Sequence, residues 1–366
     1  MSIDKNGSIK KYFGRKSLVV QALVFAVGLA LSFGFLGCTR GGSAPAKVVN
    51  LAIWGNYLTP DLVKKFEAES GIKVNISNYN SNEELLAKIQ AGASGIDVAV
   101  PSDYMVRILT KLSLLHEIDR AQIANIDKLL PELLHQDFDP ENRYSWPYTW
   151  STAGIAVNRD LFKGDIKGWK AVFTDQQLAG KVSLLDDVRE VLAAALKYNG
   201  YSVNTTNPDE LKKAESTLLE VKPRVKMFRS DTIDALLKKE VAVAHAFSTD
   251  ALQAAAKSGS KIEFILPEEG GTRSIDTLVI LKGSKNLESA HKLLNFMLSP
   301  EVNVSFVKSV WGGPVLKTTR AQLPENMKNS PVLFPAEAKL AKFESVLDLG
   351  VKTRLYDQLW TRIKTN

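Results

Sequence analysis

Short apolar stretches alternate with amphipathic ones between residues 48 and 100, and this alternation restricts the fold more than any other feature. We expect strands at residues 48–53, 72–76 and 97–100, and helices at residues 60–70 and 80–92. Pro60 suits the first turn of a helix, and Gly71 suits the position after its end. A strand–helix–strand–helix–strand order implies a parallel sheet with right-handed crossovers. The sequence therefore predicts an α/β fold.

A second α/β pattern follows a long polar stretch that contains Trp146 and Trp150. We expect strands at residues 182–186 and 241–247, helices at residues 188–198 and 210–220, a strand at residues 277–281 that returns to the first sheet, a helix at residues 288–298 and a helical segment at residues 336–364. A chain of 366 residues is too long for one ordinary core. Two lobes are therefore expected.

The formal net charge of +7 suggests an acidic partner such as nucleic acid, but the distribution of charge argues against one. Residues 1–37 contain five basic side chains and one acidic side chain, so the rest of the chain has a net charge of only +3. No run of Lys and Arg with interleaved aromatic residues occurs in that remainder. We therefore expect no nucleic-acid partner.

The N-terminus has the organisation of an export signal. A basic stretch ends at Lys16, an apolar run covers residues 18–37, and small residues follow. The run is about long enough to span a bilayer, so an uncleaved N-terminal anchor helix is the alternative to a processed signal. Both interpretations place the globular part outside the cytoplasm, on a membrane surface.

The only cysteine, Cys38, directly follows Leu36 and Gly37, and this Leu-Gly-Cys sequence resembles a bacterial lipobox. The resemblance implies that residues 1–37 are a lipoprotein signal peptide and that Cys38 is acylated as the first mature residue. Residues 38–47 then form a flexible tether. With no second cysteine, the globular part has no disulfide and depends on its core alone.

In folds built from two α/β lobes, ligands bind between the lobes at the carboxyl ends of the strands. Residues next to the ends of predicted strands are therefore candidates for a binding site. They include Trp54, Tyr57, Ser102, Asp103, Tyr104, Asp187, Glu190, Phe247 and Asp276.

Three separated carboxylates, those of Asp187, Glu190 and Asp276, lie beside aromatic residues in this set. Carboxylates pair with ammonium groups, and aromatic rings cover methylene groups and offer cation–π contact, so the set suits an elongated organic polycation. Asp187 and Glu190 are three residues apart and can face the same side of one helical turn. The residues alone also allow Asp187 as a simple helix N-cap, Trp54 as a core residue and Arg189 as an internal counter-ion.

Five segments distributed over nearly the whole mature chain resemble the spermidine/putrescine-binding proteins of polyamine ABC importers. They are IWGNYLTPDLVKKFEAESGIKV, VPSDYMV, FDPENRYSWPY, LLDDVREVLAAALKYNGYSVNTTNP, and EEGGTRSIDTLVI before LLNFMLSPEV. The resemblance implies a two-lobed periplasmic-binding-protein fold (type II-like) whose lobes are joined by crossing segments. It also implies ligand capture by hinge closure, with no catalysis, no cofactor and no metal.

The resemblance further implies partners, a location and lobe boundaries. The partners are a polyamine and the permease and ATPase subunits of an ABC transporter, and the protein is expected to be a monomer. Its location is the periplasm or cell surface, attached to a bacterial membrane by the lipid on Cys38. The first lobe is expected to comprise residues 48–150 and 275–320, and the second lobe residues 151–274 and 321–366.

Residue by residue, the resemblance assigns aromatic, hydroxyl and carboxylate groups to the ligand. The aromatic and polar positions of the first lobe are matched by Trp54, Tyr57, Ser102 and Tyr104. Asp187 and Glu190 match the carboxylates for one ammonium end, and Asp276 matches the carboxylate for the secondary or far amine.

The chain departs from the family pattern at three positions. Phe247 and Ser274 replace tryptophans, and Val346 replaces a frequent glutamine. One lost stacking face weakens binding by about 0.5–2 kcal/mol. Asp103, between Ser102 and Tyr104 in the sequence, supplies a possible replacement charge. The preferred amine is therefore open.

Other functions remain alternatives at this point. A protein of the same fold could bind another solute, although Arg189 and Arg273 are the only basic candidates for an anion. An exported glycosidase would need two carboxylates that flank a bond, whereas Asp187 and Glu190 share one helical turn. An adhesin that has lost transport is the third alternative. The four histidines are not at metal-ligand spacing, so no metal site is expected.

Overall fold

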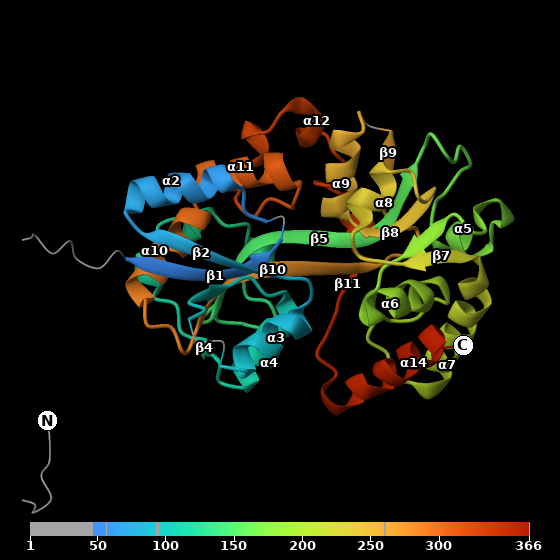
Figure 1. Ribbon diagram of the computed structural model, residues 1–366, viewed down its shortest axis with the longest axis horizontal. Coiled ribbons are helices and arrows are strands. Elements are labelled where there is room, and N and C mark those ends of the chain that lie inside the picture. Colours follow the sequence, from blue (N-terminus) through green and yellow to red (C-terminus); the bar gives the residue numbers. More distant parts are fainter. Residues whose placement is uncertain (1–46, 56, 93–94, 260, 366) are drawn as a thin grey trace, which may run out of the picture. The chain divides into compact units, whose positions relative to one another are not determined.

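The computed structural model describes residues 47–365 except residues 56, 93–94 and 260. The described residues form two α/β lobes on one continuous mixed sheet (Figure 1). The strand order is β2-β1-β3-β10-β5-β8-β6-β7, with β4 and β11 paired to β10 and β9 paired to β5.

The first lobe begins with the predicted β-α-β-α-β unit. Its elements are β1 (Val48–Trp54), α2 (Pro60–Ser70), β2 (Lys73–Tyr79), α3 (Asn82–Gln90) and β3 (Val98–Ala99). β1 pairs in parallel with both β2 and β3, so the predicted parallel sheet is confirmed. The Thr59 hydroxyl caps the start of α2, and Gly71 ends this helix with a φ of 68°.

Two long strands, β5 (Ser145–Asn158) and β10 (Thr272–Leu281), pass through both lobes, and Figure 1 shows them crossing the centre of the sheet. They pair with each other in antiparallel fashion. β10 also pairs with β3 in the first lobe, while β5 pairs with β8 and β9 in the second. The expected return of the chain to the first sheet is therefore confirmed. The prediction that the polar stretch around Trp146 and Trp150 interrupts the α/β pattern is wrong for these two residues. Both belong to β5, in which every residue except Trp150 is buried.

The second lobe contains most of the chain between these two strands. Its elements are α5 (Trp169–Thr174), β6 (Val182–Leu184), α6 (Val188–Tyr198), α7 (Pro208–Val221), β7 (Val225–Phe228), α8 (Thr232–Leu237), β8 (Val243–Phe247), α9 (Ser248–Lys257) and β9 (Ile262–Ile265). β6 pairs in parallel with β7 and β8. The second α/β pattern is thus confirmed, with β7 as an additional strand.

The remaining elements are α4 (Asp103–Lys111), β4 (Leu115–His116), α10 (Leu287–Met297), α11 (Pro300–Val310), α12 (Glu325–Lys328), α13 (Glu337–Leu340), β11 (Glu344–Ser345) and α14 (Thr353–Thr365). Short 3-10 turns occur at Arg120–Gln122, Ile126–Lys128, Pro131–Leu133, Gln176–Leu178, Lys222–Arg224, Arg320–Gln322 and Gly350–Lys352. The expectation of one helical segment over residues 336–364 is wrong in its middle. There β11 pairs with β10, and Gly350 turns the chain with a φ of 56°.

Each lobe has a hydrophobic core of its own. One core packs α2, α10 and α11 around β1 and β10, and it also contains Leu323, Met327 and Leu333. A second core packs α5, α6, α7 and α14 around β6. Another cluster beside it contains residues of α8, α9 and β9 together with Phe343. Val332 also belongs to this cluster, whereas Leu333 belongs to the first core, so the chain lies at the boundary of the two lobes from residue 332 to residue 343.

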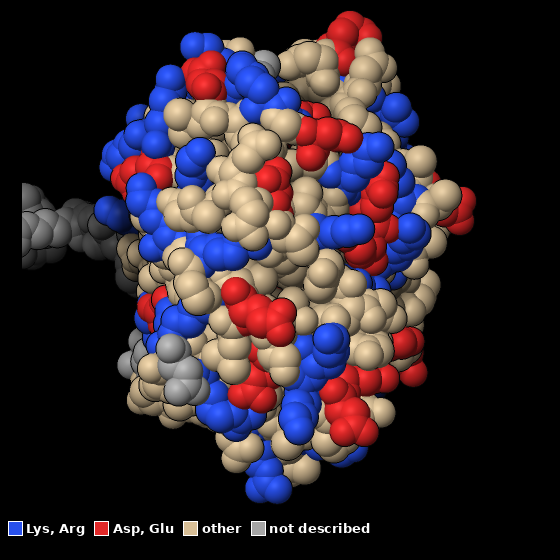
Figure 2. Space-filling model, turned by 90° about the vertical axis from the view of Figure 1, so that its right-hand side faces the viewer, with Lys and Arg blue, Asp and Glu red and all other residues tan. Residues whose placement is uncertain are grey.

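The predicted signal peptide, Cys38 and all of the predicted tether except Lys47 lie outside the described residues. Among the helices that are described, none has the length and apolar character needed to cross a membrane. Figure 2 shows the end of the molecule that carries the second lobe. Basic and acidic side chains are interspersed over it.

Candidate functional site

Asp276 lies at the centre of the candidate site, on β10, with a side chain that is 4% exposed. The Tyr57 hydroxyl donates to its Oδ2 and the Ser102 hydroxyl donates to its Oδ1, each over 2.7 Å. Burial raises the pKa of Asp276, while these two hydrogen bonds favour its ionised form. Each oxygen keeps a further lone pair for a ligand.

The sheet explains why these three residues meet. Tyr57 follows β1 and Ser102 follows β3, so both lie at the carboxyl edge of the parallel strands. β10 is the neighbour of β3, and Ser102 forms an isolated bridge with Asp276. Burial and the neighbouring Asp276 charge keep the pKa of Tyr57 well above its ordinary value, so its hydroxyl remains a donor.

Asn82 positions Ser102, a role that was not predicted. Its Nδ2 donates to the Ser102 hydroxyl over 3.1 Å, and its Oδ1 accepts from the Ser102 backbone N–H over 3.1 Å. Asn82 is the first residue of α3 and is buried. A polar residue in the first turn of a helix that begins at the site edge is the signal that could have identified it.

Trp54 and Tyr104 extend the aromatic part of the site in the first lobe. The Trp54 ring packs against Tyr79 at a centroid distance of 4.7 Å, and its Nε1 donates to the Val100 carbonyl. It is only partly buried, so the structure places it at the core boundary. The Tyr104 hydroxyl donates to Glu83 Oε1 over 2.9 Å.

Asp103 is the first residue of α4 and is 2% exposed. It accepts hydrogen bonds from the backbone N–H groups of Tyr104 and Ile275. Burial, followed by the charge of Asp276, raises the pKa of Asp103 to about 7. The carboxylates of Asp103 and Asp276 are therefore close enough to repel each other.

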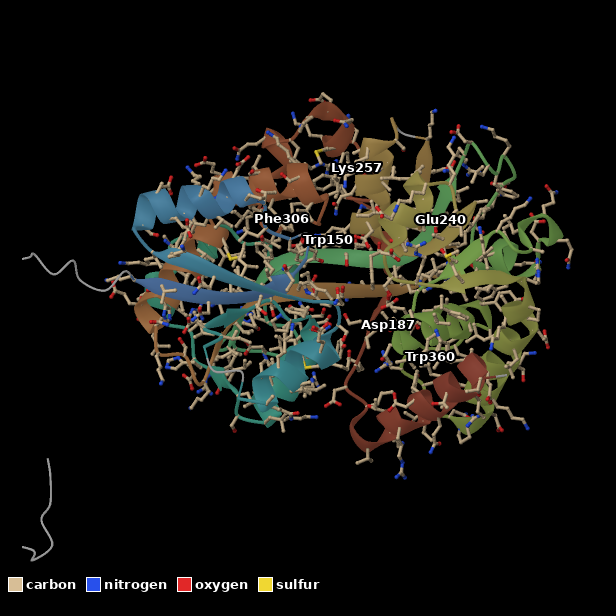
Figure 3. All side chains as sticks on the ribbon, in the orientation of Figure 1. Trp150, Asp187, Glu240, Lys257, Phe306 and Trp360 are labelled. Carbon is tan, nitrogen blue, oxygen red and sulfur yellow. The ribbon has the colours of Figure 1, made fainter. Side chains whose placement is uncertain are left out.

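The second lobe contributes Asp187 and Glu190 at the start of α6. Asp187 Oδ1 accepts from the backbone N–H groups of Arg189 and Glu190 at 2.8 and 3.0 Å, so it is the N-cap of this helix. The Glu190 carboxylate is buried and accepts from the Thr272 hydroxyl over 2.6 Å. Burial, followed by the charge of Asp187, raises the pKa of Glu190 to about 8. Figure 3 shows Asp187 beside α6, below the crossing strands.

Arg189 makes its hydrogen bonds with other groups, although its charge favours the ionised forms of both Asp187 and Glu190. Its guanidinium donates to the Leu347 carbonyl and to Asn204 Oδ1, and it lies 4.7 Å from the Tyr356 ring centroid. His245 Nε2 is 4.0 Å from Glu190 Oε2, but burial lowers the pKa of His245 to about 3, so this imidazole is neutral.

Burial also raises the pKa of Asp187, and the charge of Glu83 in the first lobe adds to this increase. Asp103, Asp187, Glu190 and Asp276 thus form a set of four carboxylates with raised pKa values, contributed by both lobes. No lysine or arginine of the described residues forms an ion pair with any of the four. Buried carboxylates without a counter-ion are costly. The arrangement therefore favours a cationic ligand.

The structure also locates the three departures from the family pattern. Phe247 ends β8 and packs against the second core. The Ser274 hydroxyl lies 3.2 Å from that of Ser151 on β5, and Val346 is buried. Hydroxyl and aliphatic groups therefore occupy positions for which the family pattern predicts a ring and an amide.

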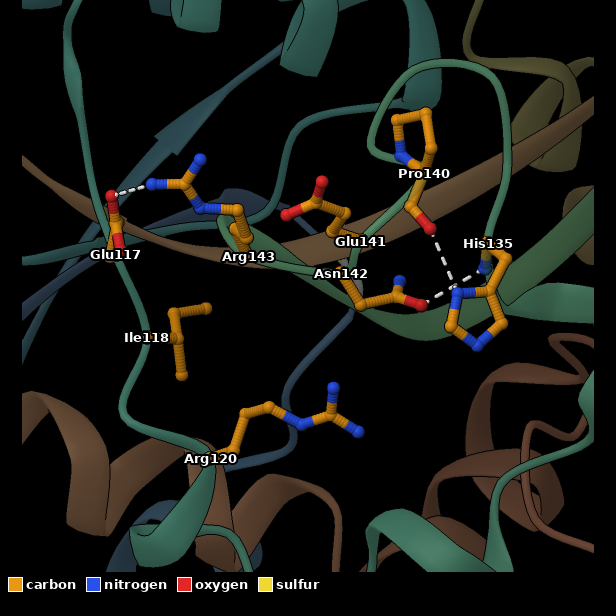
Figure 4. Close-up of a pocket in the computed structure, with 8 residues that line it drawn as sticks. All are labelled: Glu117, Ile118, Arg120, His135, Pro140, Glu141, Asn142 and Arg143. Atoms are coloured by element: carbon orange, nitrogen blue, oxygen red, sulfur yellow. Dashed lines mark hydrogen bonds and ion pairs between the residues drawn. The ribbon is translucent and has the colours of Figure 1, made fainter.

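An open pocket of about 520 Å³ lies elsewhere in the first lobe (Figure 4). It is lined by Glu117, Ile118, Arg120, His135, Pro140, Glu141, Asn142 and Arg143. Figure 4 shows Arg143 paired with Glu117 and His135 bonded to the Pro140 carbonyl. Basic and acidic groups alternate here, and none of the candidate site residues lines this pocket. In the part of the chain that is described, no group of three or more metal-ligating side chains is assembled.

Comparisons with known proteins identify relatives over most of the chain. The family model described as bacterial extracellular solute-binding protein matches residues 61–335. A putrescine/cadaverine-binding protein of Pseudomonas aeruginosa is 33% identical, and the match covers 87% of this chain and 94% of that protein. A spermidine/putrescine-binding periplasmic protein of Salmonella typhimurium is 34% identical, covering 85% of this chain and 90% of that protein.

Solved structures show the same architecture. The PotD substrate-binding protein of a spermidine/putrescine ABC transporter from Streptococcus pneumoniae has a TM-score of 0.78 at 30% identity, covering 87% of this chain and 98% of that one. The TpPotD lipoprotein of Treponema pallidum has a TM-score of 0.79 at 30% identity, covering 87% and 99%. The two-lobed fold is that of periplasmic binding proteins.

Proposed function

The chain belongs to the bacterial extracellular solute-binding protein family, and from this premise we propose that it captures spermidine or putrescine between its lobes for an ABC importer. Members of this family are the binding components of ABC transporters, so the protein is not an enzyme. They act in the extracellular or periplasmic space.

Four carboxylates that form no ion pair with a Lys or Arg side chain, three of them buried, carry this proposal. A polyamine offers two or more ammonium groups separated by methylenes, and each ammonium forms charge-assisted hydrogen bonds with carboxylates. Asp276 and Asp103 lie on the first-lobe side, and Asp187 and Glu190 on the second. A cation that bridges the two groups stabilises contact between the lobes, which is how a hinged binding protein closes around its ligand.

The residues assigned to the ligand are those expected from the sequence. They are Trp54, Tyr57, Ser102, Asp103, Tyr104, Asp187, Glu190, Phe247, Ser274 and Asp276. Phe247 offers a smaller ring than tryptophan, and Ser274 with Ser151 offers hydroxyl groups in place of a second ring. With these replacements, the positions of the carboxylates determine which of the two amines is preferred.

In this proposal the first lobe comprises residues 48–150 and 275–320, and the second lobe comprises residues 151–274 and the chain from Phe343 onward. Residues 321–342 connect them, because Leu323, Met327 and Leu333 belong to the first core while Val332 belongs to a cluster of the second lobe.

A lipid on Cys38 attaches the protein to the membrane in this proposal, with the preceding residues removed as a signal peptide. The lipobox-like sequence supports this attachment, and so does the similarity to the TpPotD lipoprotein of Treponema pallidum. Mass spectrometry of the protein extracted from cells is then expected to show a mature chain that begins at an acylated Cys38, whereas Cys38→Ala should carry no lipid and retain residues 1–37. A mature wild-type chain without a lipid on Cys38 would refute the anchor.

A thermal-shift panel tests the ligand class. Spermidine and putrescine are expected to raise the melting temperature, whereas glutamate and phosphate leave it unchanged. At a ligand concentration 100 times Kd, the stabilisation is about 2.7 kcal/mol. If neither amine raises the melting temperature, the polyamine assignment is wrong.

A further inference from the structure

The segment from Glu344 to Asp348, here called the clasp segment, is fixed to the second lobe. Glu344 forms an ion pair with Lys197 of α6 and accepts a hydrogen bond from the Ser202 hydroxyl. The following Leu349 packs against the second core. The clasp segment therefore moves with the second lobe.

Hydrogen bonds to the backbone hold the clasp segment along its length. The Asn204 side chain donates to the Ser345 carbonyl and accepts from the Leu347 N–H, at 2.9 and 2.8 Å. Arg189 donates to the Leu347 carbonyl. Polar side chains of the second lobe thus keep this irregular stretch in one conformation.

One side of helix α4 in the first lobe meets the clasp segment. Asp103, Arg107 and Lys111 are four residues apart along α4 and therefore share a face. The Ser345 side chain favours the ionised form of Asp103 near the start of the helix. At the other end, Lys111 Nζ lies 2.6 Å from Asp348 Oδ2. The segment runs alongside α4 and contacts both of its ends.

The Lys111–Asp348 ion pair differs from an ordinary surface pair. The Asp348 side chain is only 10% exposed, against 61% for Lys111. Its Oδ1 also accepts from the backbone N–H of Gly350 over 2.8 Å, so the carboxylate is fixed before Lys111 arrives. Burial opposes ionisation of Asp348, but the hydrogen bonds from Lys111 and Gly350 outweigh it and lower the pKa of this carboxyl.

We propose that Lys111 and Asp348 are positioning residues for ligand capture: their ion pair joins the two lobes and stabilises the closed conformation without touching the ligand. Lys111 is eight residues from Asp103, which corresponds to about 12 Å along the helix. The pair forms only when α4 lies against the clasp segment, and opening of the lobes breaks it. It therefore slows ligand release.

This inference rests on the proposed function, because it assigns a role within lobe closure. Its first test is the rate of spermidine or putrescine dissociation, measured by stopped-flow displacement on the full chain. Lys111→Ala and Asp348→Asn are each expected to speed dissociation by about three- to tenfold, with little change in the association rate. The double variant should dissociate no faster than either single variant, since both remove one interaction.

The matched control is Lys238→Ala, which breaks the Lys238–Asp234 ion pair at the end of α8 in the second lobe. It should leave the dissociation rate unchanged. High salt should accelerate release by a larger factor from the wild type than from Lys111→Ala, because the lysine is exposed to screening. Equal rates for wild type and Lys111→Ala, or an equal effect of the control, would overturn the inference.

A second readout separates this inference from the proposed function. The distance between fluorophores on the two lobes reports closure with or without ligand. If wild-type protein binds neither amine, the proposed function fails, and the clasp is judged on this distance alone. Lys111→Ala must then increase it relative to wild type. An unchanged distance would contradict the proposed role of the Lys111–Asp348 ion pair, whichever ligand the protein binds.

Discussion

The hydroxyl of Tyr57 donates a 2.7 Å hydrogen bond to Oδ2 of Asp276, although 219 residues separate them in the chain. Tyr57 comes from the end of the first strand and Asp276 from a strand that passes through both lobes. The bond orients the carboxylate and stabilises its ionised form. In the proposed function, this bond prepares Asp276 to accept an ammonium group.

Tyr57→Phe tests this orientation. The ring and its packing remain, while one donor to Asp276 is lost. We expect the free energy of polyamine binding to weaken by about 0.5–1.5 kcal/mol, the net value of one hydrogen bond. Isothermal titration calorimetry measures it. Tyr198→Phe, on the far side of the second lobe, is the control and should bind as wild type does.

Glu190 predicts how stability depends on pH in the absence of ligand. Its folded pKa of about 8 lies above the ordinary value of 4.5, so between these pH values the folded chain keeps a proton that the unfolded chain has lost. Stability attributable to this group is therefore present below pH 4.5 and lost as pH rises through 8. Urea unfolding at pH 5, 7 and 8.5 should show a falling midpoint.

Glu190→Gln should flatten this part of the pH profile, because the amide does not ionise. A saturating polyamine should also offset the loss in wild type, since it supplies the missing positive charge. Asp61→Asn, at an exposed carboxylate, is the control and should leave the profile unchanged. A wild-type midpoint that rises from pH 5 to 8.5 would contradict this account of Glu190.

Asn82→Ala removes both hydrogen bonds that hold Ser102. We expect a loss of about 1–3 kcal/mol of folding stability, because the Ser102 N–H is left buried without its partner, and weaker ligand binding. Thermal melts and calorimetry measure the two effects. Asn75→Ala makes the same change on the exposed part of β2 and should leave the ligand Kd unaltered. Unchanged ligand affinity in Asn82→Ala would remove Asn82 from the site.

Phe247→Leu tests whether the Phe247 ring contributes to ligand binding. Leucine keeps much of the packing against the second core but offers no π face. Binding should weaken by about 0.5–2 kcal/mol, the range for a cation–π contact. Calorimetry against both amines measures it, with Phe228→Leu on β7 as control. Equal affinity in wild type and Phe247→Leu would make Phe247 a purely structural residue.

The parallel part of the fold could be predicted because its signals are local. Pro60, Gly71 and the apolar periodicity define α2 and its neighbouring strands within a few residues. β5 could not be identified in this way, since its Ser and Thr residues are buried only through pairing with β10, β8 and β9, which are distant in sequence. A strand at the centre of a sheet therefore carries little of the alternation on which prediction depends.

The carboxylates of the candidate site could be predicted from the sequence, but the contacts of the residues around them could not. Asp187 and Asp276 follow from the strand ends and from the family pattern. Two alternatives needed side-chain geometry to resolve: Asp187 does cap α6, and Arg189 turns away to Leu347 and Asn204. Asn82 was missed because its one local signal, a polar residue in the first turn of a helix, is shared with many helix starts that have no such role.

Calorimetric titration of the purified protein with spermidine and with putrescine measures polyamine capture itself. Saturable binding of one amine per protein is expected, and Asp276→Asn should weaken it by about 2–5 kcal/mol because an ammonium then lacks its buried partner. Wild-type protein that gives no saturable heat with either amine would show that the protein does not capture these polyamines.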